Sequence, residues 1–364
     1  MSRAWDYRYV IVSIGNEGSR LVKSILETIG SCPVLELSHS LVPSGKKLYL
    51  KLEQFNPNHS IKDRTALGLV LAALESGLLV PGGTLIESTS GNLGKSLAMI
   101  GAAMGLKVIV VVDPKVSSSA INWYKAYGAQ VDLVTTPDGQ GGYQRARIER
   151  VQQLLHEYPG SYWPNQYDNP HNPDYHEKVS AKEFASLDYD VLAGCVSTGG
   201  HLSGIARGIK RVRPQVKVLA CDVLGSAVLG GAFSPYLLNG VGLAWRSANT
   251  HLECFDYHSL IDDHHAISMC RILARENGLL LGGSAGLVAY GALQCLYSSS
   301  AKSVLAIMPD SGTNYLDTLY DDRWLDEKQI QLYGVEALRQ DLKASEFKRS
   351  RPGMDVEHLA SMSY

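Results

Sequence analysis

The first candidate for chemistry is a lysine at the end of a turn. Lys62 lies in the stretch NPNHSIKDR, after the strand-like run 47–53 and before the apolar, helix-like run 66–79. A lysine amine becomes a nucleophile when a buried site lowers its pKa, and it can then form a Schiff base with an aldehyde. A lysine beside Asp63 and Arg64 is more often a solvated surface residue. Lys62 by itself therefore decides nothing.

Hydroxyl and amide side chains gather at a second turn between a strand and a helix. The motif ESTSGNLG carries Ser88, Thr89, Ser90, Gly91 and Asn92. Backbone N–H groups at such a turn attract anions, because they point at the ligand and the helix dipole is positive there. The motif nearly matches the nucleotide loop GxxxxGK[ST], but the first glycine would fall on Thr89, so that reading fails. A plain helix cap is the alternative.

Two more turns follow later strand-like runs. The motif VSTGGHLSG contains two consecutive glycines, which let a backbone approach a phosphate closely, and hydroxyl donors beside them. The glycines are Gly199 and Gly200, and the hydroxyl donors are Ser197 and Thr198. The motif PDSGTNYL follows the last apolar run, where Ser311 could face a heterocyclic nitrogen in a cleft. Taken alone, each motif is an ordinary turn.

Strand-like and helix-like runs alternate around these turns. The strand-like runs after Lys62 cover 84–87, 106–112, 131–135, 191–195, 216–222 and 303–308, and the helix-like runs cover 94–105, 119–127, 143–158, 178–187, 202–212, 266–277 and 287–297. Continuously apolar strands that alternate with helices are typical of parallel sheets covered on both faces. The predicted fold is α/β with two lobes, each a mostly parallel twisted sheet flanked by helices, and a cleft between the lobes.

We expect the chain to divide into four parts. These are an N-terminal segment over 1–47 that packs on the large lobe, a small lobe over 48–164, a large lobe over 165–330 and a polar C-terminal tail over 331–364. Within the first part, the pattern predicts a strand over 9–13 and a helix over 20–28.

Composition argues against several classes of function. A formal net charge of −2 over 364 residues gives no reason to expect nucleic acid or an anionic membrane as partner. The longest strongly apolar run, 108–112, is too short to cross a bilayer, and residues 1–20 lack the pattern of a secretory signal, so we expect a cytoplasmic protein. The 6 cysteines show no zinc-binding spacing and the 11 histidines form no HExxH motif, so we expect no metal.

The order of the motifs is more informative than any one of them. NHSIKDR, ESTSGNLG, NQYDNPHNPDYHE, VSTGGHLSG, GGSAG and PDSGTNYL together resemble the motif series of the fold-type-II pyridoxal-phosphate (PLP) enzymes. Within that group the chain resembles the cysteine synthase and cystathionine β-synthase family, from about residue 25 to residue 316. The resemblance implies PLP as the cofactor, a homodimer and β-replacement on an activated serine through an aminoacrylate.

The resemblance also implies a role for each motif. Lys62 should form the Schiff base with the cofactor and act as general base, and Asn92 should bind the ring hydroxyl. The turn 197–201 should bind the phosphate, and Ser311 should face the pyridine nitrogen. A serine there leaves that nitrogen largely unprotonated, which favours elimination; the adjacent Asp310 would reverse this effect if it faced the nitrogen instead. The residues implied to bind substrate are Ser88, Thr89, Ser90, Gly91, Gln166, Tyr167, Ser197 and Gly240.

Three residues depart from the cysteine synthase pattern. Ser197, Tyr167 and Leu93 stand where that pattern has glycine, phenylalanine and threonine. The first two add hydroxyls, which suit an acceptor larger than sulfide. The motifs ESTSGNLG, VVDPK, PDGQGGY and YWPNQY resemble a specialised branch of the family, the N-(2-amino-2-carboxyethyl)-L-glutamate synthases.

That branch implies O-phospho-L-serine as donor, the α-amine of L-glutamate as nucleophile and phosphate as leaving group. Its product supplies 2,3-diaminopropionate for a siderophore or a peptide antibiotic. Arg246, His201 and the turn after Ser88 are candidates for binding the acceptor carboxylates, and the sequence does not choose among them. Two alternatives remain: a cysteine synthase that uses O-acetylserine or O-phosphoserine with sulfide, and a non-catalytic family member that acts as a binding subunit.

Overall fold

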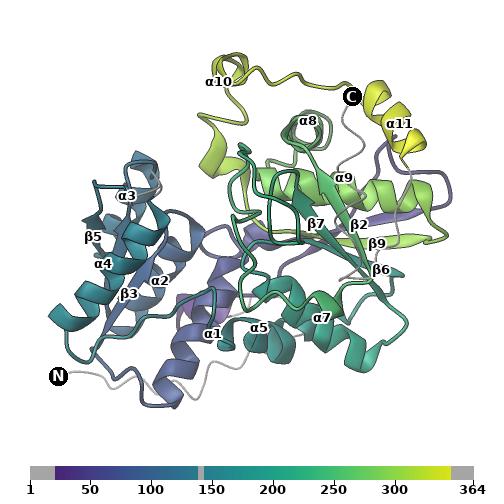
Figure 1. Cartoon of the computed structure of the whole chain (residues 1–364). Coiled ribbons are helices and arrows are strands. Elements are labelled where there is room, and N and C mark those ends of the chain that lie inside the picture. The colour runs from purple at the N-terminus through teal and green to yellow at the C-terminus, as the bar shows by residue number, and fades with distance from the viewer. Residues whose placement is uncertain (1–20, 138–142, 346–364) are drawn as a thin grey trace. The chain divides into compact units, whose positions relative to one another are not determined.

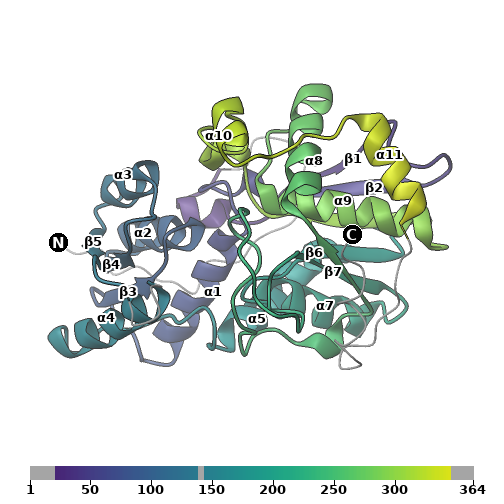
Figure 2. The same cartoon turned by 45° about the horizontal axis from the view of Figure 1, so that its top comes forward.

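The computed structural model describes residues 21–137 and 143–345, and these form two compact units. Unit 1 comprises Met1–Ser31 and Phe55–Tyr175, and unit 2 comprises Cys32–Gln54 and His176–Tyr364. Most of the longer elements of both units are labelled in Figure 1 and Figure 2, and each unit is described by itself.

Unit 1 is a parallel three-stranded sheet with helices on both faces. The strands lie in the order β3 (Thr84–Ser88), β4 (Lys107–Val112) and β5 (Gln130–Leu133). The helices are η2 (Ile25–Thr28), α1 (Lys62–Glu75), α2 (Asn92–Met104), α3 (Ser118–Ala126), α4 (Gln144–Glu157) and α5 (His171–Tyr175).

The strand β4 shows why both faces of this sheet are covered. Val108, Val110 and Val112 belong to one hydrophobic cluster, which also contains Leu97 of α2. The intervening residues Ile109 and Val111 belong to a second cluster with Val151 and Leu154 of α4. Because alternate side chains of a strand point to opposite faces, a continuously apolar strand requires cover on each.

Unit 2 contains a six-stranded sheet in the order β1-β2-β9-β6-β7-β8. Its strands are β1 (Val34–Glu36), β2 (Lys47–Leu52), β6 (Val191–Cys195), β7 (Lys217–Val223), β8 (Tyr257–Ile261) and β9 (Ser303–Met308). All neighbouring pairs are parallel except β1 with β2. The longer helices are α7 (Gly200–Val212), α8 (Asp263–Asn277), α9 (Gly283–Ser298) and α11 (Val335–Ala344), and the shorter segments are η3 (Glu53–Phe55), η4 (His176–Ser180), α6 (Ala181–Phe184), η5 (Leu252–Cys254), η6 (Gly312–Tyr315) and α10 (Asp322–Glu327).

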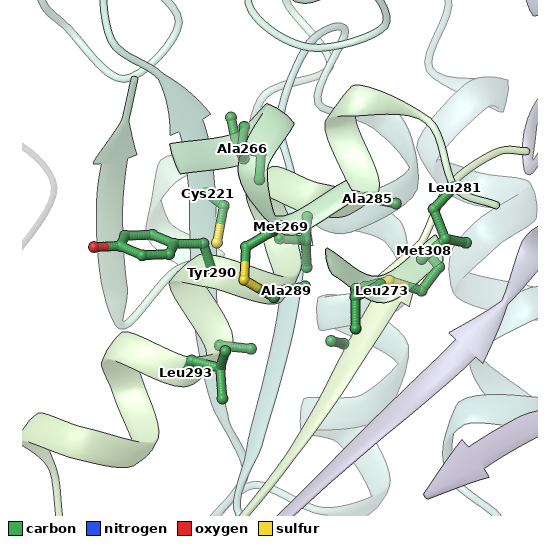
Figure 3. Packing of buried hydrophobic residues seen from close by; sticks show 14 of the residues in the cluster. Cys221, Ala266, Met269, Leu273, Leu281, Ala285, Ala289, Tyr290, Leu293 and Met308 are labelled. Atoms are coloured by element: carbon green, nitrogen blue, oxygen red, sulfur yellow. The ribbon is translucent and has the colours of Figure 1, made fainter. Parts of the chain in front are cut away.

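The core of unit 2 forms around α9. Figure 3 shows Ala289 and Leu293 of this helix among Met269 and Leu273 of α8 and Cys221 of β7, and all of them are fully buried. A helix that is apolar on every side must be enclosed, and nearly every residue from Gly283 to Leu296 is buried.

The α/β class and its mostly parallel sheets are confirmed, but several local elements differ from the predictions. The early helix over 20–28 is only the 3-10 turn Ile25–Thr28. The part called a polar tail contains α11, whose Leu338 and Leu342 are fully buried in the core of unit 2. The predicted strand over 9–13 and the segment beyond residue 345 lie outside the described residues.

The compact units also divide the chain at other points than the predicted boundaries. The strand Lys47–Leu52, placed by sequence mostly in the small lobe, pairs along its whole length with β9 of unit 2. Pairing between residues about 250 positions apart leaves no local signal in the sequence. Proximity along the chain therefore did not predict which unit contains this strand.

Candidate active site

The predicted site residues come from both units. Lys62, Ser88, Thr89, Ser90, Gly91, Asn92, Gln166 and Tyr167 belong to unit 1, whereas Ser197, Thr198, Gly199, Gly200, His201, Gly240 and Ser311 belong to unit 2. Within the described residues no cluster of three His, Cys, Asp or Glu side chains could hold a metal ion, and no helix could cross a membrane.

Lys62 is the first residue of α1, four residues earlier than the helical pattern begins in the sequence. It is partly buried, and its backbone N–H donates to Ser60 Oγ at 3.2 Å. The hydroxyl of Ser60 thus satisfies an N–H group that the helix itself leaves without a partner. The amine-bearing residue therefore lies at the start of α1, where the hydrogen bond to Ser60 defines its backbone position.

The turn 88–92 connects the end of β3 to the start of α2. Gly91 is the N-cap of α2, so no cap side chain fills the space before the first turn, and a Cβ built on it would meet nothing within 4 Å. The hydroxyl of Tyr124 donates to the Gly91 carbonyl at 3.0 Å, which holds the turn from α3. Ser88 and Thr89 are buried, whereas Ser90 and Gly91 are exposed. The turn therefore presents hydroxyls and a helix N-terminus, which suits an anionic group.

Glu87 is a functional candidate that the sequence analysis passed over. Its Oε1 accepts from the Ser88 N–H at 2.8 Å and from Trp163 Nε1 at 3.0 Å. The carboxyl is completely buried, and this burial raises its pKa to about 7. Burial also raises the pKa of Tyr167 to about 12, with the negative charge of Glu87 as a second cause. Glu87 thus links the turn 88–92 to the loop that carries Gln166 and Tyr167.

We expect the buried Glu87 carboxyl to make stability depend on pH. Because its pKa is raised from 4.5 to about 7, its contribution is fully present below pH 4.5 and is lost as pH rises through 7. The loss is on the order of 3 kcal/mol, at about 1.4 kcal/mol per tenfold change in proton affinity. Urea unfolding from pH 5 to pH 8 should therefore show the stability of the wild type falling relative to Glu87→Gln. If the difference in stability between the two proteins stayed constant from pH 5 to pH 8, the Glu87 carboxyl would not have a raised pKa. Burial also raises the pKa of Asp222 to about 7. Because both proteins contain Asp222, its contribution to the pH dependence cancels in the comparison.

The turn 197–201 in unit 2 connects β6 to α7. Gly199 adopts φ +76°, and a Cβ there would lie 2.5 Å from the Cα of Thr250, so only glycine fits. Gly199 is also the N-cap of the 13-residue helix α7, and it brings no capping side chain. The hydroxyl of Ser247 donates to the Thr198 carbonyl, which gives the turn a second contact beside that of Gly199 with Thr250. This glycine cradle at a helix N-terminus fits a phosphate.

Ser197 joins this turn to the loop with Gly240. Its Oγ donates to the carbonyl of Gly242 at 3.3 Å, and the Gly242 N–H donates to the Val196 carbonyl at 2.8 Å. Gly240 and Gly242 both have positive φ, at +82° and +70°. The predicted phosphate turn and the predicted loop for the substrate amine are thus hydrogen-bonded to each other.

Two buried serines of unit 2 could face a ring nitrogen. Ser311 is the N-cap of η6, and its Oγ accepts from the Thr313 N–H at 3.2 Å. Ser284, in the motif GGSAG, is 1% exposed in the first turn of α9, and a Cβ built on Gly240 would lie 3.9 Å from its Oγ. The sequence analysis noted that motif without assigning Ser284 a role. The neighbouring Asp310 is buried and accepts from the Tyr315 hydroxyl at 2.7 Å.

Two candidates for binding acceptor carboxylates lie in different surroundings. Arg246 is exposed, and its Nε donates to the Val228 carbonyl at 2.8 Å. His201 is 5% exposed, and its ring lies edge-on to His176 with centroids 6.3 Å apart. An exposed guanidinium can reorient toward a ligand, whereas the enclosed imidazole has little freedom to do so.

Taken one by one within their own units, the predicted site residues have chemistry that fits PLP. The amine of Lys62 at the start of α1 suits an aldehyde, the cradle at Gly199 suits a phosphate, and a buried serine hydroxyl suits a pyridine nitrogen. The six cysteines are buried and free, and burial raises the pKa of Cys221 and Cys270 above the usual thiol value. Buried thiols of this kind are poor nucleophiles, so they do not compete with the lysine for this chemistry.

Comparison with known proteins identifies the family. The family model described as "Pyridoxal-phosphate dependent enzyme" matches residues 25–310. Two proteins named N-(2-amino-2-carboxyethyl)-L-glutamate synthase are each 38% identical: that of Ralstonia nicotianae over 84% of this chain and 91% of its own, and that of Cupriavidus metallidurans over 83% and 91%.

Solved structures agree with this match. The chain resembles O-ureido-L-serine synthase with a TM-score of 0.77 and 33% identity, over 84% of this chain and 100% of that one. It resembles the cysteine synthase of Entamoeba histolytica with a TM-score of 0.81 and 30% identity, over 92% and 99%. The chain therefore belongs to the pyridoxal-phosphate-dependent enzymes and has the fold-type-II architecture of cysteine synthase. It is a PLP-dependent enzyme of β-replacement on serine.

Proposed function

We propose that the protein joins the three-carbon unit of O-phospho-L-serine to the α-amine of L-glutamate and releases phosphate. The product would be N-(2-amino-2-carboxyethyl)-L-glutamate. The observation that carries this proposal is the hydrogen bond from Ser197 to the Gly242 carbonyl, which a glycine at position 197 cannot make. The names of the two relatives at 38% identity support the same acceptor.

In this proposal Lys62 holds the cofactor and moves the proton. Bound PLP supplies the electron sink for the carbanion at Cα of the donor. The Lys62 amine, once released, takes the proton from that Cα as general base. Asn92 donates to the hydroxyl of the cofactor ring, and residues 197–201 bind its phosphate.

The turn 88–92 and the loop with Gln166 bind the donor in this proposal. Ser88, Thr89, Ser90 and Gly91 offer hydroxyls and a helix N-terminus to its carboxylate, and Gln166 offers an amide. Gln166 is buried, and its backbone carbonyl accepts a hydrogen bond from Asn172 Nδ2 at 2.8 Å. This bond fixes the position of the loop backbone. Tyr167 and Ser197 then add hydroxyls toward a polar acceptor, and Gly240 leaves space for the donor's amine.

Ser311 is our candidate for the partner of the pyridine nitrogen, with Ser284 as the second candidate. The Oγ of Ser311 already accepts as a helix cap but can still donate. The near-complete burial of Ser284 beside Gly240 favours the alternative. Replacing the serine that contacts the pyridine nitrogen by alanine should change the absorbance maximum of bound PLP. Replacing the other serine should not. If neither Ser311→Ala nor Ser284→Ala changes the spectrum, neither serine contacts the nitrogen.

Acceptor choice tests the proposal directly. In a mixture of L-glutamate and sulfide, the double variant S197G/Y167F should shift the product ratio toward cysteine by about 30-fold, because each of the two hydroxyls would contribute roughly 1 kcal/mol to a polar acceptor and about 1.4 kcal/mol is a factor of ten. Each single variant should shift the ratio less. A double variant with the product ratio of the wild type would favour the alternative, a cysteine synthase. A protein that binds PLP without any turnover would favour a binding subunit.

We also propose the setting in which the enzyme works. Its product would supply 2,3-diaminopropionate for a siderophore or a peptide antibiotic, and the enzyme would act in the cytoplasm as a homodimer. Light scattering of the purified protein tests the dimer, since a monomer of 39.6 kDa would contradict it. If the enzyme supplies the precursor of 2,3-diaminopropionate, cells that lack the protein should no longer make this amino acid.

A further inference from the structure

The turn before Lys62 contains a strained residue. His59 has φ +59°, in the left-handed region that residues other than glycine rarely adopt. Its N–H donates to the Asn56 carbonyl at 2.8 Å, so the turn closes around this conformation. A residue in this region keeps its conformation only when the surrounding structure holds it there. The contacts that hold it are therefore worth tracing, because Lys62 lies only three residues further on.

Asn58 is the centre of those contacts. It is 1% exposed, its backbone N–H donates to Asp63 Oδ2 at 2.8 Å, and its side-chain Nδ2 donates to Asp63 Oδ1 at 3.0 Å. Asp63 is itself fully buried and follows Lys62 directly. The two residues on either side of the segment 59–62 are thus joined by two hydrogen bonds to one carboxyl group. This clamp sets where the chain enters α1.

A residue from another helix completes the clamp. Trp123 of α3 donates its indole N–H to Asn58 Oδ1 at 3.0 Å, and its ring meets the His59 ring edge-on with centroids 6.2 Å apart. Trp123 therefore contacts both the strained residue and the residue that anchors the turn. The bond to Oδ1 also leaves the Nδ2 of Asn58 directed at Asp63, because an amide has one acceptor end and one donor end.

A buried cation also lies over the Trp123 ring. Lys95 of α2 is 3% exposed, and its Nζ lies 4.0 Å from the centre of the Trp123 ring. A cation over an indole face is attracted by the ring, and the attraction is stronger where water is excluded. Lys95 thus fixes the orientation of the ring that donates to Asn58. The contact joins α2 and α3 to the turn before α1 within unit 1.

We propose that Trp123, oriented by Lys95, is a positioning residue that holds the strained turn 56–61 and thereby sets the location of Lys62. The proposal rests on the proposed role of Lys62 as the cofactor-binding amine. It goes beyond that role, because it assigns a task to α3 and to two side chains outside the motifs that define the family match.

Hydrogen–deuterium exchange on the PLP-free protein is the test. In Trp123→Phe the aromatic face for Lys95 remains and only the N–H donor is lost, so the amides of residues 58–63 should exchange about 5- to 10-fold faster. Trp163→Phe is the matched control, since it also loses an indole donor with a 3.0 Å bond in unit 1 and should leave these amides unchanged. Lys95→Met provides a second variant and should speed exchange at the same amides. Unchanged exchange at 58–63 in both Trp123→Phe and Lys95→Met would overturn the proposal.

A rescue separates control of the turn from general packing. Glycine accepts positive φ at no cost, so His59→Gly added to Trp123→Phe should return exchange at 58–63 toward the wild-type rate. On the PLP-loaded protein, the pH at which the Schiff-base absorbance changes should shift in Trp123→Phe and return in the double variant. If His59→Gly restores neither, Trp123 acts through packing alone and the proposal fails. If borohydride reduction labels no Lys62 in the wild type, the proposed function fails while the exchange results still decide the role of Trp123.

Discussion

Replacement of Lys62 by alanine is expected to abolish turnover and the Schiff-base absorbance of bound PLP while leaving the protein folded. The amine has two tasks in the proposed reaction, covalent attachment of the cofactor and removal of the Cα proton. General base catalysis alone contributes about 10²- to 10⁴-fold, so turnover should fall at least about 1,000-fold. Lys62 is only partly buried at the start of α1, and alanine suits a helix, so the fold should persist.

The measurement combines absorbance, steady-state turnover and circular dichroism. Lys125→Ala is a suitable control, because Lys125 is an exposed residue of α3 outside the proposed site and should leave both absorbance and turnover unchanged. A Lys62→Ala protein that still forms a Schiff base, or still turns over within about 10-fold of the wild type, would place the reactive amine elsewhere.

Replacement of Gly199 by alanine should have the second largest effect. Its φ of +76° costs an alanine about 1 kcal/mol, and the new Cβ would lie 2.5 Å from the backbone of Thr250. Relief of that overlap requires a backbone shift, which typically costs about 1–3 kcal/mol in a packed site. We expect a loss of about 2–4 kcal/mol in the free energy of unfolding and at least 10-fold weaker PLP binding, since the displaced turn is the proposed phosphate cradle.

Gly105 is the matched control for this variant. It has a similar φ of +70° at the C-terminus of α2, but a Cβ there would meet nothing within 4 Å. Gly105→Ala should therefore lose only about 1 kcal/mol and bind PLP normally. Urea unfolding of the PLP-free proteins and titration with PLP measure both effects. Equal losses for the two variants would mean that the contact with Thr250 does not constrain the turn.

Much of the architecture follows from local patterns in the sequence. Strands such as Val191–Cys195 and Ser303–Met308 match the apolar runs residue for residue, because burial on both faces demands continuous apolar sequence. The strand Tyr257–Ile261 was missed, because it lies at the edge of its sheet and is only half-buried over most of its length. Its sequence YHSLI lacks the apolar run that enclosure imposes on central strands.

The site was predictable as motifs but not as contacts. The turns 88–92 and 197–201 lie between a strand and a helix as predicted, since glycines and hydroxyl residues mark such turns. The bond from Ser197 to Gly242 joins residues 45 positions apart, and that from Trp123 to Asn58 joins residues 65 apart. Neither has a local signal. Glu87 was overlooked for a related reason, because only the fold reveals that its carboxyl is buried beside Trp163.

The most direct test of the proposed function is the identity of the product. Purified protein loaded with PLP would be incubated with O-phospho-L-serine and an equimolar mixture of L-glutamate and sulfide, and the products would be identified by mass spectrometry. We expect an adduct that joins the serine-derived three-carbon unit to the nitrogen of glutamate, together with free phosphate. Cysteine as the sole product would make the protein a sulfhydrylase, and it would remove any role for the hydroxyls of Ser197 and Tyr167 in the choice of acceptor.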